Sequence, residues 1–427
     1  MEQTLTKLYP ANPTSTSNLG FGNDIAIDGG WMVVSHLGAQ YQEIYMFKWD
    51  GSQWIEHQKI GYPGQHETLN AYYGGSVDIS GDTIVVAAYH DNGEGTGKTT
   101  IDRGGGSVFV YRLDATDNDT WKQEAIIAND LQSPEGGGPN WTNFFGQFLR
   151  LEGDTLVVPH FNGGYVLGFV TIYDRDCTSG TCSWSKLQRI EGPDTPGDHS
   201  GFGGGVALSG NTLFVGAHGI DVDGVSNAGT IFYYTRDQVG GQWTRQQSFT
   251  TSGAMNNDQS SIILAFDGET LLVPSWLRTV DGVPGVGHAW VFEQNSNTGE
   301  WEVTQELENP SGAAGIYYGA WRPSVRGDTL VIPSRAGIDV WKKTGGTWAL
   351  EKTISKSGEH CESTAFHDDS LVFSCDFTDG KKGAIYYLTC PDAFPAAAAD
   401  GGSAPASGGK CTHFLCAISP YHGSNMP

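Results

Sequence analysis

The most evident absence from this 427-residue sequence is a long apolar run. No segment approaches the roughly 20 consecutive apolar residues that a membrane-spanning helix needs. The first ten residues, MEQTLTKLYP, lack the apolar core of a secretory signal peptide, so we expect a mature or trimmed chain. Long helical patterns are missing as well, which leaves short strands as the building units.

Basic residues are also scarce. Lys and Arg number 24 against 48 Asp and Glu, so the formal net charge is −24. A surface this acidic repels phosphate backbones and anionic lipid, which argues against nucleic-acid and membrane-surface partners. The chain also lacks Gly-x-Ser-x-Gly, His-Glu-x-x-His and a phosphate-binding loop, so no common catalytic motif is present.

What the sequence does have is glycine and aromatic side chains. It contains 60 Gly, 13 Trp, 17 Tyr and 19 Phe. Disordered chains are depleted in aromatics, so these numbers indicate an ordered chain that is rich in turns. Short runs of β-branched and aromatic residues, separated by Gly, Asp and Asn, predict an all-β fold.

One pattern recurs seven times, as in FGGGVALSGNTLFVGAHG at residues 202–219. An aromatic-Gly start and a short strand lead to a two-residue turn, a strongly apolar strand and a loop. A third strand rich in aromatics and a fourth that opens with Trp complete each repeat. The turn positions tolerate positive φ and are Gly29-Gly30, Gly81-Asp82, Gly153-Asp154, Gly210-Asn211, Gly268-Glu269, Gly327-Asp328 and Asp368-Asp369.

The seventh repeat lacks a fourth strand of its own. Six fourth strands begin at Trp54, Trp121, Trp184, Trp243, Trp301 and Trp348, whereas the last repeat runs into Cys390-Pro391. Residues 2–8, EQTLTKL, have the length and the apolar ending of the missing strand. We therefore predict a seven-bladed β-propeller of four-stranded antiparallel blades, closed by the N-terminal strand, which leaves no unpaired edge at the seam.

The repeat FGGGVALSGNTLFVGA, followed by GTIFYY and GQWTRQQSF, resembles the FG-GAP repeat family. This propeller repeat is also found in the heads of integrin α-subunits, and a variant with SGDTLVVGA and a trailing Gly-x-Trp strand is common in secreted microbial and algal proteins. The resemblance covers residues 1–390 and recurs in every blade. It implies a propeller that acts in adhesion or ligand binding.

The end of the chain differs in composition from the repeats. Residues 391–410 are rich in Ala, Pro, Gly and Ser, which is typical of a flexible linker. Residues 411–427 form a short tail that contains two cysteines. The tail is either pinned or disordered, or it is a peptide that docks onto a neighbouring chain.

Seven cysteines indicate an oxidising compartment. Cys177 and Cys182 flank a short loop, and Cys361 and Cys375 lie nearly opposite each other in a predicted hairpin, so we expect two disulfides. Cys390, Cys411 and Cys416 remain, and one of these three is left free or pairs with another chain. The sequons at Asn118 and Asn140 lie in predicted loops and suit glycosylation in a eukaryotic secretory pathway.

Candidate binding residues come from the geometry of a propeller. The loops before strand one and after strand two share a face, and here they are the long ones, so we expect the binding residues there. Aromatic, Arg and Asp side chains suit a sugar or a peptide, although the same side chains could instead pack the blades together. The ends of the second strands supply His36, Tyr89, His90, His160, His218, Trp276, Arg335 and Asp376.

Calcium is the expected cofactor if a metal binds. Integrin-type FG-GAP loops carry Asp-x-Asp-x-Asp-Gly, and this chain has only DVDGVSN, in which Asp221, Asp223 and Asn227 could supply oxygens. The alternative is an ordinary Asp-Gly turn. Zinc is a weaker expectation, because the histidines of the predicted ring show no His-x-His or His-x3-His spacing.

These observations predict a secreted, non-enzymatic recognition or adhesion propeller that binds an extracellular glycan or protein. One alternative is a structural subunit that assembles with itself through residues 391–427. A second alternative is a carbohydrate-active lyase or hydrolase, which needs two cooperating carboxyl groups or an acid and base pair. No pair stands out among the carboxylates expected on the loop side, which are Glu67, Asp194, Asp198, Asp258 and Asp376.

Overall fold

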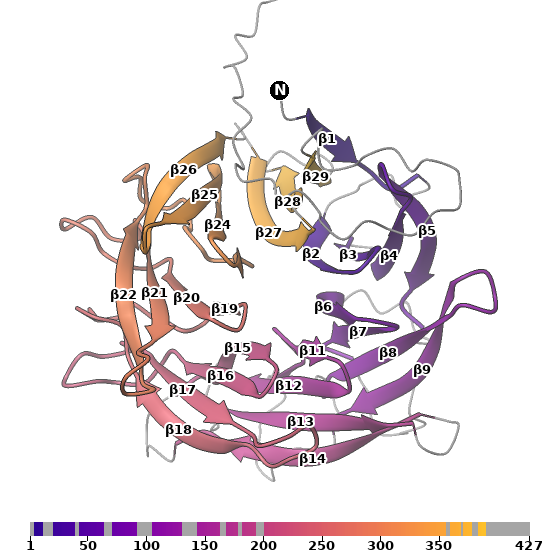
Figure 1. Cartoon of the computed structure of the whole chain (residues 1–427), viewed down its shortest axis with the longest axis horizontal. Helices are drawn as coiled ribbons and strands as arrows, with labels where there is room; N and C mark the ends of the chain where they lie inside the picture. The colour runs from indigo at the N-terminus through magenta and orange to yellow at the C-terminus, as the bar shows by residue number, and fades with distance from the viewer. Residues whose placement is uncertain are drawn as a thin grey trace, which may run out of the picture.

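A computed structural model describes residues 4–11, 20–38, 42–63, 71–91, 105–129, 143–162, 168–177, 182–193, 200–355, 359–368, 370–377 and 383–389. Within these ranges the chain forms only strands and turns, and the strands build seven antiparallel sheets around a central axis (Figure 1). The described residues contain no helix that could cross a membrane. The predicted seven-bladed β-propeller is confirmed.

The strands follow the chain order blade by blade. Blade 1 contains β2 (Phe21–Asp28), β3 (Trp31–Leu37), β4 (Gln42–Trp49) and β5 (Trp54–Gly61). Blade 2 contains β6 (Tyr73–Ser80), β7 (Thr83–Ala88), β8 (Ser107–Asp114) and β9 (Thr120–Ala128). Blade 3 contains β10 (Asn143–Phe145), β11 (Arg150–Glu152), β12 (Thr155–Asn162), β13 (Phe169–Asp176) and β14 (Ser183–Glu191). Blade 4 contains β15 (Phe202–Ser209), β16 (Thr212–Ala217), β17 (Thr230–Thr235) and β18 (Thr244–Phe249). Blade 5 contains β19 (Ala265–Phe266), β20 (Thr270–Ser275), β21 (His288–Gln294) and β22 (Trp301–Glu308). Blade 6 contains β23 (Ser324–Arg326), β24 (Thr329–Ser334), β25 (Gly337–Thr344) and β26 (Thr347–Ser355). Blade 7 contains β27 (Glu359–His367), β28 (Ser370–Phe377) and β29 (Ala384–Thr389), together with β1 (Thr4–Leu8).

The N-terminal strand closes the ring, as the missing fourth strand predicted. β1 pairs antiparallel with β29, from Thr4 opposite Thr389 to Leu8 opposite Ile385. The first and last strands of the propeller therefore share one sheet. If β1 separates from β29, both strands present unpaired backbone groups at the edge of blade 7. The stability of the first strand of the chain therefore depends on the last strand, and the reverse.

The glycine of the aromatic-Gly motif allows a blade that carries it to approach the preceding one. Gly74 has φ +92°, and a Cβ added there would lie 3.0 Å from the Cβ of Ser35 in blade 1. Gly22 has φ +90°, and its added Cβ would lie 2.7 Å from the Cβ of Ser374 in blade 7. The motif thus combines a left-handed backbone with a contact that only hydrogen can fit. The aromatic residue before each glycine, such as Phe21 or Tyr73, is buried in the core.

A glutamine in the fourth strand joins neighbouring blades at their outer edge. The side-chain amide of Gln58 donates to Trp121 O at 2.9 Å, and its carbonyl oxygen accepts from Trp121 N at 2.7 Å. The same two-bond contact joins Gln188 to Trp243. It recurs from Gln247 to Trp301 and from Gln305 to Trp348. Each of these glutamines lies four residues after the Trp of its own strand, so the pattern Trp-x3-Gln could have been recognised in the sequence.

The innermost strands are less regular than the repeats predict. In blade 3 the inner strand is divided into β10 and β11, which both pair with β12. Phe148 lies between them with φ +62°, a conformation that ends regular pairing. In blades 5 and 6 only the ends of the inner strands pair, as β19 and β23.

Both expected disulfides are present. Cys177 joins Cys182 across a separation of five residues, and Cys361 joins Cys375, which lies directly opposite it in the β27–β28 ladder. Cys390, Cys411 and Cys416 lie outside the described residues, as do the whole linker and the tail. Their pairing and any role of residues 391–427 stay predictions.

Candidate functional site

The two faces of the propeller differ in the connections that they carry. In blade 1, Phe21 at the start of β2 lies opposite His36 near the end of β3, whereas Asp28 at the end of β2 lies opposite Trp31. We call the side of Phe21 and His36 the loop face, because it carries the loops before the first strand and after the second. We call the other side the turn face, because it carries the two-residue turns.

Two of the predicted ring histidines on the loop face are core residues. His36 is fully buried, with its Nδ1 atom 3.7 Å from Glu43 Oε2 and its ring against Phe21. The His160 ring is buried and stacks on Phe169 with centroids 4.0 Å apart. Neither side chain is placed to meet a ligand at the loop face.

His218 occupies a slot that two glycines leave open. Cβ atoms added at Gly201 and Gly204 would lie 2.3 Å and 2.7 Å from its ring. Burial lowers the pKa of His218 to about 4, against a hydrogen bond with the Gly201 backbone that raises it. The imidazole is therefore neutral near pH 7 and packs blade 4 together.

Tyr89 and His90 lie in an aromatic cluster between blades 2 and 3. The Tyr89 ring stacks on Tyr72 with centroids 4.9 Å apart and an interplanar angle of 22°. His90 meets both rings edge-on, and Phe144 contacts Tyr89 and His90 from blade 3. All four side chains are partly exposed.

Trp276 and Arg335 lie in a second aromatic cluster, between blades 5 and 6. The Trp276 and Tyr317 rings stack with centroids 5.1 Å apart, at an angle of 25°. The Arg335 guanidinium carbon lies 3.8 Å from the Tyr317 centroid, and Trp321 contacts the same tyrosine. Arg335 is exposed, and the three aromatic side chains are partly exposed. We call these four residues the loop-face platform.

Backbone strain accompanies both clusters. Tyr72 and Tyr317 both have φ +54°. The equivalent position, two residues before the motif glycine, is Gly20 in blade 1 and Gly201 in blade 4, with φ +81° and +60°. A tyrosine in this left-handed conformation costs about 1–2 kcal/mol relative to glycine. Local strain of this kind is concentrated at functional sites.

The structure describes only part of the carboxylate set that the enzyme alternative needs. Asp258 is buried, and its Oδ2 atom lies 2.5 Å from Arg278 Nη1 and accepts the Met255 N–H at 2.7 Å. These contacts give Asp258 a structural role in blade 5. Glu67, Asp194 and Asp198 lie outside the described residues, and only the backbone of Asp376 is described.

The expected calcium loop forms a tight Asp-Gly turn. Val222 and Val225 exchange two backbone hydrogen bonds around Asp223, which has φ +51°. Asp221 Oδ1 accepts the Asn227 N–H at 2.7 Å. Calcium takes six to eight oxygens, more than these side chains supply. Among the residues that the structure describes, no group of three or more His, Cys, Asp or Glu could hold a metal, and calcium binding stays a prediction.

Of the two sequons, one lies in the described part of the chain. Asn118 is exposed in the turn between β8 and β9. Asn140 lies outside the described residues. Glycosylation at both positions stays a prediction.

The sequence did not reveal a cavity of about 680 Å³ in the central channel. Each blade contributes one inner segment to its wall, from residues 25–29 in blade 1 to residues 364–368 in blade 7. Because these segments end at the two-residue turns, the cavity reaches the turn face. None of the eight predicted ring residues lines it.

One arginine spans this channel. Arg322 enters from blade 6, and its Nε atom lies 3.0 Å from Asp24 Oδ1 in blade 1. Its two terminal nitrogens donate to Val77 O and Ser76 Oγ in blade 2, both at 3.0 Å. Asp24 is buried and also accepts the Val77 N–H at 2.9 Å. Arg322 therefore ties three blades together.

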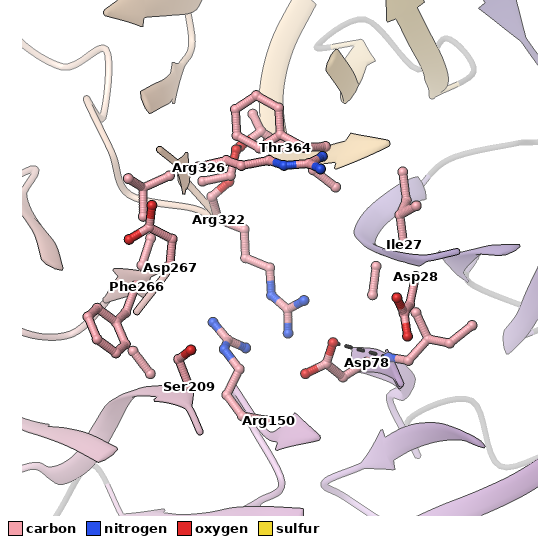
Figure 2. Close-up of a pocket in the computed structure, with 18 of the residues that line it drawn as sticks. Ile27, Asp28, Asp78, Arg150, Ser209, Phe266, Asp267, Arg322, Arg326 and Thr364 are labelled. Carbon is pink, nitrogen blue, oxygen red and sulfur yellow. Dashed lines mark hydrogen bonds between the residues drawn. The ribbon is translucent and has the colours of Figure 1, made fainter. Parts of the chain in front are cut away.

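A second arginine points toward the first. Arg150, from β11 in blade 3, extends into the channel so that its guanidinium faces that of Arg322, with Asp78 beside them (Figure 2). Burial and the charge of Arg322 lower the pKa of Arg150 to about 10, so it stays charged near pH 7. Asp78 accepts the Leu151 N–H at 2.9 Å and thereby holds the start of this segment.

Comparison with known proteins supports the FG-GAP repeat and the propeller fold. The sequence profile of the FG-GAP repeat matches residues 68–111, which include β6 and β7. No curated protein matches the chain. A candidate 6-phosphogluconolactonase from Bacteroides uniformis ATCC 8492 has a similar structure, with a TM-score of 0.52 and 12% identity over 78% of this chain and 86% of that chain.

Two further solved structures are similar at a lower level. A protein from Lactobacillus plantarum has a TM-score of 0.49 and 12% identity, covering 78% of this chain and 85% of its own. The polysaccharide lyase Uly1 has a TM-score of 0.49 and 11% identity, covering 89% and 93%. At identities this low, structural similarity concerns the fold and says nothing of activity.

Proposed function

Because the chain is a β-propeller of the FG-GAP repeat family, we propose that it is an extracellular recognition protein that binds a glycan on its loop face without catalysing a reaction. The loop-face platform of Trp276, Tyr317, Trp321 and Arg335 is the observation that carries this proposal. Two disulfides support an extracellular location, because such bonds persist in oxidising compartments.

The chemistry of the platform suits sugars. A pyranose ring presents an apolar face of C–H groups, which can pack on a partly exposed indole such as Trp276. Its hydroxyl oxygens can accept hydrogen bonds from an exposed guanidinium such as Arg335, which has five N–H donors. Because Trp276 and Tyr317 are already stacked, little side-chain entropy is lost on binding.

The strained backbone of Tyr317 supports a binding role for the loop-face platform rather than a packing role. Glycine fills the equivalent position in blades 1 and 4, so the fold does not require a side chain there. Stacking with Trp276 returns about 0.5–1.5 kcal/mol of the cost, which leaves no clear gain in stability. A ligand that contacts the platform would explain why the tyrosine is present.

Binding to immobilised polysaccharides tests the proposal. The probes are xylan, laminarin, alginate and pectin, and the readout is the half-saturating concentration of the purified protein. We expect at least one of them to bind, and we expect Trp276→Ala to weaken that binding by about tenfold or more. Tyr9→Ala is the matched control, because Tyr9 is an exposed aromatic in the segment that follows β1.

Tyr317→Gly separates binding from stability. Glycine relieves the left-handed strain while the stacking is lost, so the melting temperature should change little, whereas binding should fall as in Trp276→Ala. If both variants bind every probe as well as the wild type does, the platform is a packing feature. If no probe binds the folded wild type, the glycan proposal fails.

A further inference from the structure

The central cavity contains an arginine whose hydrogen-bonding capacity is mostly unused. Arg150 donates from Nη1 to Leu149 O at 2.8 Å. Within the described part of the chain, no carboxylate oxygen lies within 4.0 Å of its guanidinium. A guanidinium has five N–H donors in a planar fork, so most of this group is available to a ligand in the cavity.

Arg150 also breaks the repeat. The residue three positions before the turn glycine or its counterpart is Ala26, Ala207, Ala265 and Ala365 in four blades. It is Asp78 in blade 2 and Ser324 in blade 6. The inner strand therefore does not need a long side chain at this position. A charged side chain of the largest size, placed where alanine suffices, points to a role other than holding the blade.

The two guanidiniums repel each other. Arg322 lowers the pKa of Arg150, and Asp24 already neutralises Arg322 through a direct ion pair. A like-charge pair in a partly desolvated channel is unfavourable, and the nearby carboxylates of Asp78 and Asp24 oppose this effect without restoring the pKa of Arg150 to its ordinary value. An oxyanion between the two groups would accept charge-assisted hydrogen bonds from Arg150 and would also offset this repulsion.

The rest of the cavity selects among oxyanions. Its outer rim carries Asp28, Glu152 and Asp267, each of which accepts the turn N–H of the next blade and is held in place. Carboxylates keep further lone pairs that can accept hydroxyl groups, but they repel a second negative charge. Ala265 and Phe266 supply an apolar stretch of wall, and Phe266 is labelled in Figure 2.

The charges are arranged along the channel axis. Arg150 lies two residues before the rim residue Glu152, and Arg322 lies four residues before the rim residue Arg326. A ligand that enters from the turn face therefore meets the rim, with its carboxylates and Arg326, before it meets Arg150 and Arg322 at the inner end. This order fits a molecule that is anionic at one end and hydroxylated at the other.

We propose that the turn-face cavity binds a sugar acid, with its carboxylate between Arg150 and Arg322 and its hydroxyl groups toward the rim. The volume of about 680 Å³ is in the range of small-molecule sites. This site is separate from the loop-face platform and does not depend on it.

Calorimetric titration of the full protein with sodium glucuronate tests the proposal. We expect one site per chain. We expect Arg150→Gln to weaken binding by about 10- to 100-fold, because the charge-assisted hydrogen bonds from one guanidinium to the carboxylate are lost. Glucose lacks the carboxylate, and sulfate adds a second charge and lacks hydroxyl groups. Both should bind at least about tenfold more weakly than glucuronate.

Arg245→Gln is the matched control, because Arg245 is exposed on β18 and its removal changes the net charge by the same amount. It should bind glucuronate as the wild type does. The melting temperature of Arg150→Gln shows whether the variant is folded, and Arg150→Lys, which keeps the charge but not the fork, should bind with intermediate affinity.

Three results would overturn the proposal. They are no glucuronate binding to the folded wild type, equal binding by wild type and Arg150→Gln, or equal binding of glucose and glucuronate. Sulfate binding as tight as that of glucuronate would contradict the sugar-acid assignment and leave a simple anion site.

Discussion

Replacement of Arg322 by Met should destabilise the propeller strongly, because this side chain joins three blades across the channel. Arg322→Met removes the ion pair to Asp24 and the hydrogen bonds to Val77 O and Ser76 Oγ. Methionine keeps much of the apolar length of the side chain, so the substitution mainly removes charge and hydrogen bonds. The expected loss in free energy of unfolding depends on the groups that lose their partner when Arg322 is replaced.

The largest cost is the carboxylate of Asp24. Its side chain is 6% exposed, so without Arg322 a buried negative charge lacks its counter-charge. Removal of one partner from a buried ion pair costs about 3–5 kcal/mol. The hydrogen bonds that Asp24 accepts from Val77 N and Ile25 N remain and keep the loss within this range.

The loss should depend on pH. Burial raises the pKa of Asp24 above its ordinary value of 3.8, and the charge of Arg322 opposes that rise. Without Arg322 the pKa of Asp24 in the folded state rises further, while its value in the unfolded state is unchanged. A carboxyl whose pKa is raised on folding stabilises most below 3.8, and this contribution is lost as the pH rises through the folded pKa. The deficit of Arg322→Met should therefore be larger at pH 7 than at pH 5.

Urea unfolding followed by tryptophan fluorescence, at pH 7 and pH 5, measures both effects. The double variant Asp24→Asn with Arg322→Met should lose less stability at pH 7 than Arg322→Met alone, since the amide needs no counter-charge. A loss below about 1 kcal/mol at pH 7 would refute the buried-pair argument. A loss that is equal at both pH values would show that Asp24 is not the group responsible.

Four further perturbations test the contacts between blades, one disulfide and the metal. Gln247→Leu removes both hydrogen bonds to the next blade and leaves two backbone groups without partners, so unfolding by urea should show a loss of about 1–3 kcal/mol. Gly74→Ala should cost about 2–4 kcal/mol through backbone strain and overpacking, whereas Gly29→Ala, whose Cβ meets no atom within 4 Å, should cost only the strain of about 1–2 kcal/mol. Replacement of Cys361 and Cys375 together by Ala should lower the free energy of unfolding by about 3 kcal/mol, measured under non-reducing conditions, because a cross-link over 14 residues is lost. If calcium binds the Asp-Gly loop of blade 4, added calcium should raise the melting temperature and EDTA should reverse the rise, and no change in either direction would exclude a stabilising site.

The repeats made the fold predictable because each repeat position performs the same task in every blade. The two-residue turns and the apolar second strands predicted seven blades, whereas only six fourth strands begin with Trp. The missing fourth strand gave the closure by β1. Irregular inner strands were not predictable, because positive φ at Phe148 and the short pairing of β19 and β23 depend on contacts between blades.

The candidate sites were only partly predictable. The alignment of the second-strand ends predicted that Trp276 and Arg335 lie at the loop face. The structure has both residues there, in the loop-face platform. The same alignment placed His36 and His160 there, yet both are buried, because a sequence position gives the height along the axis and not the direction of the side chain. The contact between Arg322 and Val77 spans 245 residues, and nothing in the repeat pattern foretells it.

Departures from the repeat therefore carry more information about function than the repeat itself. A residue that most blades share is explained by packing, as the motif glycines are. A residue that only one or two blades carry needs a local explanation. For Arg322 that explanation is structural, because its hydrogen bonds and ion pair are satisfied within the protein. For Arg150, and for Tyr317, which has one counterpart in Tyr72 of blade 2, the protein supplies too few partners or too little stability to account for the side chain, and a ligand is the explanation that we propose.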